Sequence, residues 1–110
     1  MNKIKNIFDI KNIQSKDQEV FESLLNTSDI RVDRIITLKP YDKSGKWYDQ
    51  ETNEWVLLMQ GEAELEFEDD EKIALKSGDY IFIPAHKKHR INYSSSEPKC
   101  IWLAIYGELK

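Results

Sequence analysis

Cysteine and histidine are scarce in this chain. It has one cysteine, Cys100, and two histidines, His86 and His89, among 110 residues. A single cysteine excludes an internal disulfide and a cysteine-rich zinc site. Because Cys100 lies in the apolar run CIWLAI, we expect a small buried side chain there, with a reactive thiol as the lesser alternative. The rest of the sequence must decide whether the histidines form a metal site or belong to a polar loop.

Long hydrophobic runs and clusters of like charge are also absent. No apolar segment approaches the roughly 20 residues that a membrane-spanning helix needs. The N-terminal stretch MNKIKNIFDIKNI lacks the uninterrupted apolar part of a signal peptide. The net charge is −4, and no group of lysines and arginines stands without neighbouring acids. We therefore expect no nucleic-acid partner, no membrane partner and a cytoplasmic location.

The length and composition fit one folded domain. With 110 residues, of which 40% are hydrophobic and 33% charged, the chain can bury one core but not two. We predict an N-terminal extension over residues 1–30, a strand or helix packed on a barrel, and the barrel itself over residues 31–110. A short helix is predicted at residues 15–26, SKDQEVFESLLN. There Ser15 and Gln18 match a capping box, and the apolar residues repeat at helical spacing.

Short stretches with strand character follow. Residues 62–68, EAELEFE, alternate between apolar and acidic side chains, as in an antiparallel strand with one face in solvent. We therefore interpret the glutamate row as a solvated face and not as a metal-binding ladder. Several short strands at close spacing indicate an all-β fold, a small antiparallel β-barrel or double-sheet jelly roll. The predicted strands are residues 31–38, 54–60, 62–68, 72–75, 80–84, 89–94 and 100–106.

Two of these strands are apolar on both faces. Residues 80–83, YIFI, and residues 100–106, CIWLAIY, carry almost no polar side chain. Such strands are buried on both sides, and one small barrel core covers only one side. The N-terminal helix or a second subunit can provide the other cover. Of the two we expect a second subunit, and hence a homodimer.

A stretch near the C-terminal end of the chain resembles the second sequence motif of the cupin family of small β-barrels. In that motif a glycine, a proline, a second glycine, a histidine and an asparagine follow one another at fixed spacing. The corresponding residues here are Gly78, Pro84, His86, His89 and Tyr93. Glycine, proline and histidine thus match, whereas a histidine takes the second glycine position and a tyrosine the asparagine position. The resemblance extends over roughly residues 31–106 and implies a cupin barrel.

The first motif of the family usually has two histidines one residue apart, followed by a glutamate and a glycine. Glu54, followed by WVLLMQ and a glycine, fits the second half of this motif. The histidine pair is absent. Its positions hold Trp47 and Asp49 with the longer spacing, or Tyr48 and Gln50 with the shorter one. The resemblance implies a ligand or metal site in the barrel mouth around these positions.

Local reasoning also supports Glu54 and His89 as site residues. Each stands at the beginning of a predicted strand, on a face that is otherwise mostly apolar. A carboxylate or imidazole that faces a barrel interior must be paired, hydrogen-bonded or metal-bound, because burial without a partner is costly. With Asp49 as third ligand, the set of two oxygens and one nitrogen suits a divalent ion such as Fe, Mn, Ni or Zn. Alternatively, Asp49 caps a turn in a polar loop.

His86 has two interpretations. In the first interpretation His86 is simply a turn residue. The family has a glycine here because the turn requires a positive φ, and histidine is among the other residues that tolerate this conformation. In the second interpretation His86 lies beside the site. There it acts as an acid or base, or it orients Glu54 or a bound ligand. Direct ligation together with His89 is disfavoured, because residues three apart on a strand point to opposite faces. The residues expected to line the pocket, or to pack near it, are Trp47, Tyr48, Gln50 and Tyr93.

Three functions are compatible with this site. The first is a cupin that binds a divalent metal in the barrel mouth and binds or acts on a small polar metabolite, as an oxygenase or isomerase if it is an enzyme. The alternative is a metal-free cupin that binds a small molecule without catalysis, which the missing histidine pair favours. The third is a cupin-type isomerase or epimerase, with His89 as base paired to Glu54 and a tyrosine as acid.

Overall fold

The computed structural model describes residues 3–38 and 47–108, and it contains eight β-strands in these ranges. The all-β fold class predicted from the sequence is confirmed. Within the two described ranges, no helix has the length and apolar character of a membrane span. The strands are β1 Glu19–Asn26, β2 Ile30–Thr37, β3 Asn53–Gln60, β4 Glu62–Phe67, β5 Lys72–Lys76, β6 Tyr80–Ile83, β7 His89–Ser94 and β8 Cys100–Gly107.

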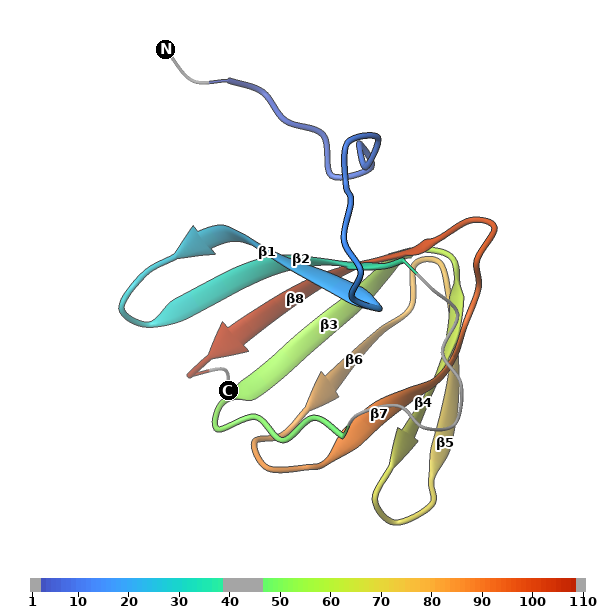
Figure 1. Ribbon diagram of the computed structural model, residues 1–110. Coiled ribbons are helices and arrows are strands. Elements are labelled where there is room, and N and C mark those ends of the chain that lie inside the picture. Colours follow the sequence, from blue (N-terminus) through green and yellow to red (C-terminus); the bar gives the residue numbers. More distant parts are fainter. Residues whose placement is uncertain (1–2, 39–46, 109–110) are drawn as a thin grey trace.

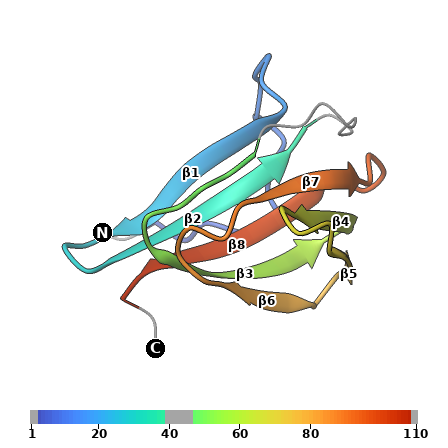
Figure 2. The same cartoon turned by 90° about the horizontal axis from the view of Figure 1, so that it is seen from below.

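The strands form two antiparallel sheets that face each other (Figures 1 and 2). The larger sheet has the order β1-β2-β8-β3-β6, and the smaller sheet has the order β5-β4-β7. Strands that are neighbours in the sheet are mostly distant in the chain, as in a double-sheet jelly roll. The sequential alternation of apolar residues directs one face of each strand between the sheets.

The core lies between the two sheets. From the larger sheet it receives Leu58 and Trp102, and from the smaller one Leu65 and Phe67, all nearly inaccessible to solvent. Cys100 is fully buried, as expected. The glutamates of β4 lie on the opposite face of the smaller sheet, where exposed Glu62 follows the expectation of a solvated row.

The predicted helix at residues 15–26 is wrong. Its last eight residues form strand β1, which pairs antiparallel with β2 from Glu19 opposite Thr37 to Asn26 opposite Arg31. A register shift between Ser23 and Leu25 adds a residue to one strand, so the apolar side chains depart from strict alternation and imitate a helical spacing. Pairing with β2 gives β1 a ladder of backbone hydrogen bonds along one edge, and this pairing outweighs the local helical preference. The extension over residues 1–30 therefore contributes an edge strand to the larger sheet.

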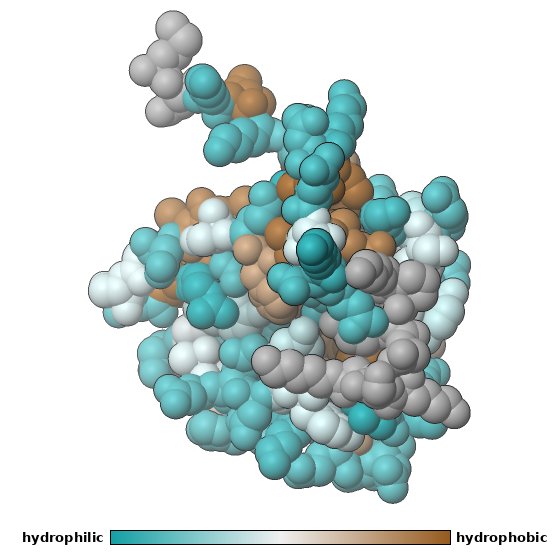
Figure 3. Space-filling model, viewed as in Figure 1, coloured by the Kyte–Doolittle hydropathy of each residue, from teal (hydrophilic) through white to brown (hydrophobic). Residues whose placement is uncertain are grey.

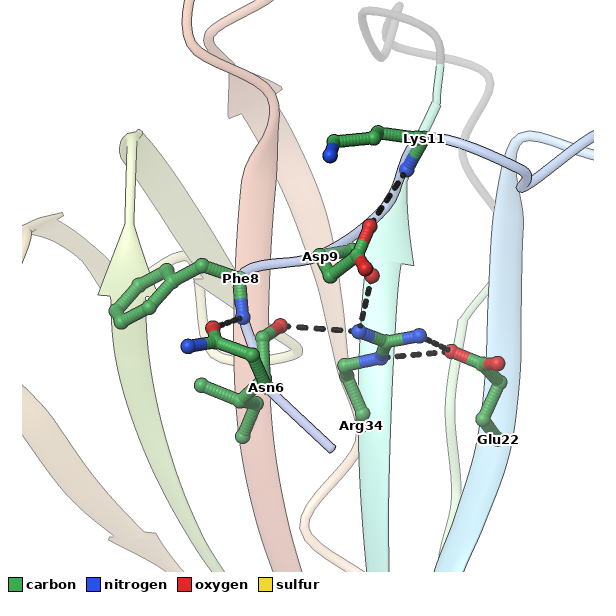
Figure 4. A network of polar contacts seen from close by, with 7 residues as sticks. Asn6, Phe8, Asp9, Lys11, Glu22 and Arg34 are labelled. Carbon is green, nitrogen blue, oxygen red and sulfur yellow. Dashed lines mark hydrogen bonds and ion pairs between the residues drawn. The ribbon is translucent and has the colours of Figure 1, made fainter. Parts of the chain in front are cut away.

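The N-terminal segment before β1 crosses the outer face of the larger sheet (Figure 4). Arg34, largely buried on β2, donates from Nη1 to the carbonyl oxygens of Ile7 at 3.0 Å and Asp9 at 2.9 Å. Its Nε donates to Glu22 Oε1 at 2.7 Å. One guanidinium thus joins β1, β2 and the segment. Figure 3 shows apolar side chains gathered where this segment meets the body of the protein.

The outer face is not covered over its whole width. Tyr80 and Phe82 on edge strand β6 are 66% and 46% exposed. The N-terminal segment covers part of the outer apolar face for which the sequence predicts a covering element, but it is an irregular segment and not a helix. Pairing with a second copy stays a prediction.

Candidate functional site

A cavity of about 40 Å³ lies between the two sheets and opens at one end of the barrel. Its walls come from both sheets and are mostly apolar, with five aliphatic side chains and the rings of Phe21, Tyr48, Trp102 and Tyr106. A volume of this size holds about three water molecules. It therefore fits one end of a small molecule. The polar or partly polar side chains among the described residues that line it include those of Glu19, Tyr48, Gln50, Glu54, His89 and Tyr106.

Glu54 is the second residue of β3, and the pleat turns its side chain into the cavity. It stands in register between Ile83 of β6 and Tyr106 of β8. It is 5% exposed, and its Oε1 has no hydrogen-bond partner. Burial raises the pKa of Glu54 to about 7, although a hydrogen bond from Tyr106 and the charge of Arg31 act in the opposite direction. The neutral carboxylic acid is therefore well populated at neutral pH.

His89 begins β7 and faces Glu54 across the cavity. Its Nδ1 lies 3.0 Å from the carbonyl oxygen of Lys87. A carbonyl only accepts hydrogen bonds, so Nδ1 carries the proton and Nε2 presents a lone pair. Nε2 lies 3.6 Å from Glu54 Oε1. Burial lowers the pKa of His89, which keeps the ring neutral.

Tyr48 fixes the position of His89 through the backbone. The Tyr48 N–H donates to the His89 carbonyl at 2.7 Å, and the His89 N–H donates to the Tyr48 carbonyl at 3.1 Å. The two rings lie 5.9 Å apart. The Tyr48 hydroxyl donates to Glu19 Oε1 at 2.6 Å, and Thr37 Oγ1 donates to Glu19 Oε2 at 3.1 Å. This chain of contacts ties β1, β2 and the segment before β3 to β7.

The predicted third ligand, Asp49, lies apart from Glu54 and His89. Its Oδ1 is 3.0 Å from His86 Nδ1, and both side chains are largely exposed. His86 has φ of 64° and donates its backbone N–H to the carbonyl of Gln50 at 2.8 Å. It thus adopts the backbone conformation of the turn interpretation and orients Asp49, not Glu54.

The predicted metal centre therefore lacks its third donor in this arrangement. Across residues 3–38 and 47–108, no three His, Cys, Asp or Glu side chains gather so as to hold a metal ion. The predicted centre consists of two carboxylates and one imidazole, and of these three donors the structure brings together Glu54 and His89. The donor set does not fit such a centre. Metal ligation by Glu54 and His89 stays a prediction.

Of the four residues predicted to line the pocket, Tyr48 and Gln50 do so. Trp47 instead lies under the guanidinium of Arg90, whose Cζ is 4.3 Å from the ring centroid. Tyr93 is 52% exposed on the outside. A register shift in the pairing of β4 with β7 leaves residue 92 extra, so the alternation that buries His89 changes face before Tyr93.

Sequence reasoning missed several residues of the cavity. Glu19 and Phe21 were placed in the predicted helix, although their spacing of two is the strand period. Trp102 and Tyr106 belong to the predicted strand at residues 100–106, but they had no place in the predicted site. The alternation of β8 puts them on the face shared with Glu54, and this pattern was sufficient to find them.

Comparison with known proteins agrees with this fold. The family model described as "Cupin domain" matches residues 34–106. A structure from Ralstonia eutropha JMP134, named a "putative mannose-6-phosphate isomerase", is 30% identical over 98% of this chain and 100% of that chain, with a TM-score of 0.83. No curated protein matches the chain.

Two more distant structures show the fold alone. A cupin superfamily protein from Desulfitobacterium hafniense DCB-2 is 24% identical over 88% of this chain and 84% of that chain, with a TM-score of 0.63. The structure named FeII HppE is 16% identical over 88% of this chain, with a TM-score of 0.73. This chain covers 54% of that longer protein. These matches confirm the resemblance drawn from the two sequence motifs.

Proposed function

Since the chain belongs to the cupin family, we propose that it binds a small polar metabolite in the cavity between its sheets and moves a proton on that metabolite with Glu54 and His89. The class of reaction is that of an isomerase or epimerase. The named function of the Ralstonia eutropha relative is of this class, and that relative is 30% identical along nearly the whole chain.

The observation that supports this function best is the unpaired Oε1 of Glu54. A buried polar atom without a partner costs free energy, and native structures usually satisfy such atoms with protein, water or ligand. The 3.6 Å between this atom and His89 Nε2 is too long for a direct hydrogen bond. A hydroxyl or carbonyl oxygen that enters the cavity can contact both groups.

The two groups differ in what they offer at neutral pH. His89 presents a lone pair at Nε2, so it accepts a proton. Glu54, with a pKa of about 7, is available as an acid. The pKa of Glu54 is shifted toward neutral pH, as is typical of a general acid, and the lowered pKa of His89 keeps its ring in the neutral form that accepts a proton.

The proton transfers balance for a substrate with a hydroxyl beside a carbonyl. His89 Nε2 takes the proton from the carbon that bears the hydroxyl, and the electrons of that C–H bond form a C=C bond. The carbonyl π electrons move to oxygen, which takes the proton of Glu54. The resulting enediol becomes the isomeric carbonyl compound when His89 delivers its proton to the former carbonyl carbon and Glu54 recovers a proton from the original hydroxyl, which becomes the new carbonyl.

A divalent metal site is the second candidate. Its support is the carboxyl of Glu54 beside the imidazole of His89 and the similarity of fold to the structure named FeII HppE. Among the described residues, Glu54 and His89 together provide one donor fewer than a three-residue centre needs.

Proton exchange at carbon tests the proposal. Chelator-treated protein is incubated with dihydroxyacetone in D₂O, and the loss of the CH₂ proton signal is followed by NMR. We expect the wild type to exchange these protons faster than buffer, and His89→Ala to abolish the difference. Tyr93→Phe, an exposed change outside the cavity, is the matched control and should exchange like the wild type.

Two outcomes would decide against the proposal. Equal exchange rates for the wild type and a folded His89→Ala variant would contradict the role of His89. Exchange that occurs only after Mn²⁺ or Fe²⁺ is added would favour the metal site.

A further inference from the structure

We infer that the part of the ligand that enters the cavity is an uncharged group carrying a carbonyl and a neighbouring hydroxyl, and that any charged group of the ligand stays outside. This inference rests on the proposed function, because it concerns the same cavity. It adds the chemical class of the ligand, which neither the fold nor the position of the site determines.

The walls of the cavity disfavour an anion. None of the described residues that line it is a lysine or an arginine, whereas Glu19 and Glu54 are both among them. Arg31, the cation that most affects Glu54, is not part of the lining. It donates from Nε to Asp33 Oδ2 at 3.1 Å and stacks on the ring of Tyr106 at 4.1 Å. A carboxylate or phosphate in the cavity would lose its hydration without gaining a counter-ion.

The same walls disfavour a cation. Glu54 and His89 carry charges of opposite sign when ionised, and burial shifts the pKa of each toward its neutral form. The cause lies in the aliphatic surroundings, which include Val56, Leu65 and Ile91. An ammonium group would need a carboxylate partner. The Glu19 carboxylate already accepts hydrogen bonds from the hydroxyls of Tyr48 and Thr37, and ionising Glu54 among these aliphatic side chains is costly.

The hydrogen-bonding groups define the polar pattern of the ligand. Neutral Glu54 offers one O–H donor, and Nε2 of neutral His89 offers one acceptor. The complement is one acceptor and one donor within a few ångströms, because 3.6 Å separates Glu54 Oε1 from His89 Nε2. A carbonyl oxygen and the hydroxyl on the adjacent carbon provide this pair at the correct scale. This arrangement describes the complex before reaction, and the C–H bond of the same carbon takes the place of the hydroxyl at Nε2 when the proton is transferred. The cavity volume of about 40 Å³ leaves room for a group of this size and little more.

Three molecules of three carbons, each with one hydroxyl group, test the inference. Hydroxyacetone is uncharged, lactate is an anion and 1-amino-2-propanol is a cation at neutral pH. Binding is followed through the indole N–H resonances of ¹⁵N-labelled protein. Trp102 lines the cavity, and its Nε1 donates to Thr37 Oγ1 at 3.2 Å, so its resonance reports on the site. Trp55 points to the opposite face of β3 and serves as the internal control.

We expect hydroxyacetone to shift the Trp102 resonance with a Kd at least about tenfold lower than that of either charged molecule, and Trp55 to stay in place. Glu54→Gln, which keeps a donor at this position, should retain binding of hydroxyacetone, and Glu54→Ala should lose it. Tighter binding of lactate or 1-amino-2-propanol at Trp102 would overturn the ligand class and leave the proposed site intact. The absence of any Trp102 shift with all three molecules would contradict the proposed site itself.

Discussion

Replacement of Glu54 by glutamine should change how the stability of the protein depends on pH. Burial raises the pKa of Glu54 from 4.5 to about 7. The folded protein therefore holds this proton more tightly than the unfolded chain does. The stabilisation is fully present below pH 4.5 and is lost as the pH rises through 7. The pKa difference corresponds to about 3 kcal/mol of unfolding free energy.

Glu54→Gln keeps the size of the side chain and removes this titration. We expect the unfolding free energy of the variant, relative to the wild type, to rise by about 3 kcal/mol between pH 4.5 and pH 8. His89 is present in both proteins, so most of its own pH dependence cancels in the difference. Urea unfolding followed by tryptophan fluorescence at four pH values measures this quantity. Glu62→Gln, which removes an exposed carboxyl from β4, is the matched control. A difference between Glu54→Gln and wild type that stays constant with pH would refute the buried position of Glu54.

Two further changes test the packing around the barrel. Gly61 and Gly78 have nearly the same positive φ, 98° and 97°, but an added Cβ would lie 2.9 Å from Cys100 Sγ at Gly61 and would have nothing within 4 Å at Gly78. Gly61→Ala should therefore lower the unfolding free energy by about 1–3 kcal/mol more than Gly78→Ala does, as measured by urea unfolding. Equal losses would show that the close contact is absent. Arg34→Met should lower the unfolding free energy by about 2 kcal/mol and speed amide hydrogen exchange in residues 6–13, because the guanidinium holds this segment on the sheet. Unchanged exchange in these residues would contradict the anchoring role of Arg34.

The parts of the fold that were predicted correctly are those that depend on local patterns. Alternation along residues 62–68 and the turn residues between the later strands were enough to identify two packed antiparallel sheets. The motif spacings placed Glu54 and His89 at the starts of β3 and β7, where they face each other. The alternation and the turns are short-range relations that are visible in the sequence. The placement of Glu54 opposite His89 depends on the packing of the two sheets and was implied by the family motifs.

The parts that could not be predicted depend on irregular pairing. The register shift in β1 altered the apolar spacing, which led to a helix and hid Glu19 and Phe21. The shift in β7 turned Tyr93 outward. Asp49 was expected beside Glu54. Instead, the turn at His86 places the Nδ1 atom of that histidine 3.0 Å from Asp49 Oδ1. A bulge is set by the partner strand, and sequence spacing alone does not reveal it.

The central claim is that Glu54 and His89 form a metal-free pair with a proton acceptor at His89 Nε2. The side-chain ¹⁵N resonances of the two histidines, recorded at pH 7 on protein purified without chelator, test it most directly, with exposed His86 as internal reference. We expect a neutral His89 with its proton on Nδ1, an Nε2 resonance unchanged by EDTA, and a shift of that resonance when hydroxyacetone is added. A metal-bound Nε2 resonance that reverts on addition of EDTA, or a proton found on Nε2, would contradict the account.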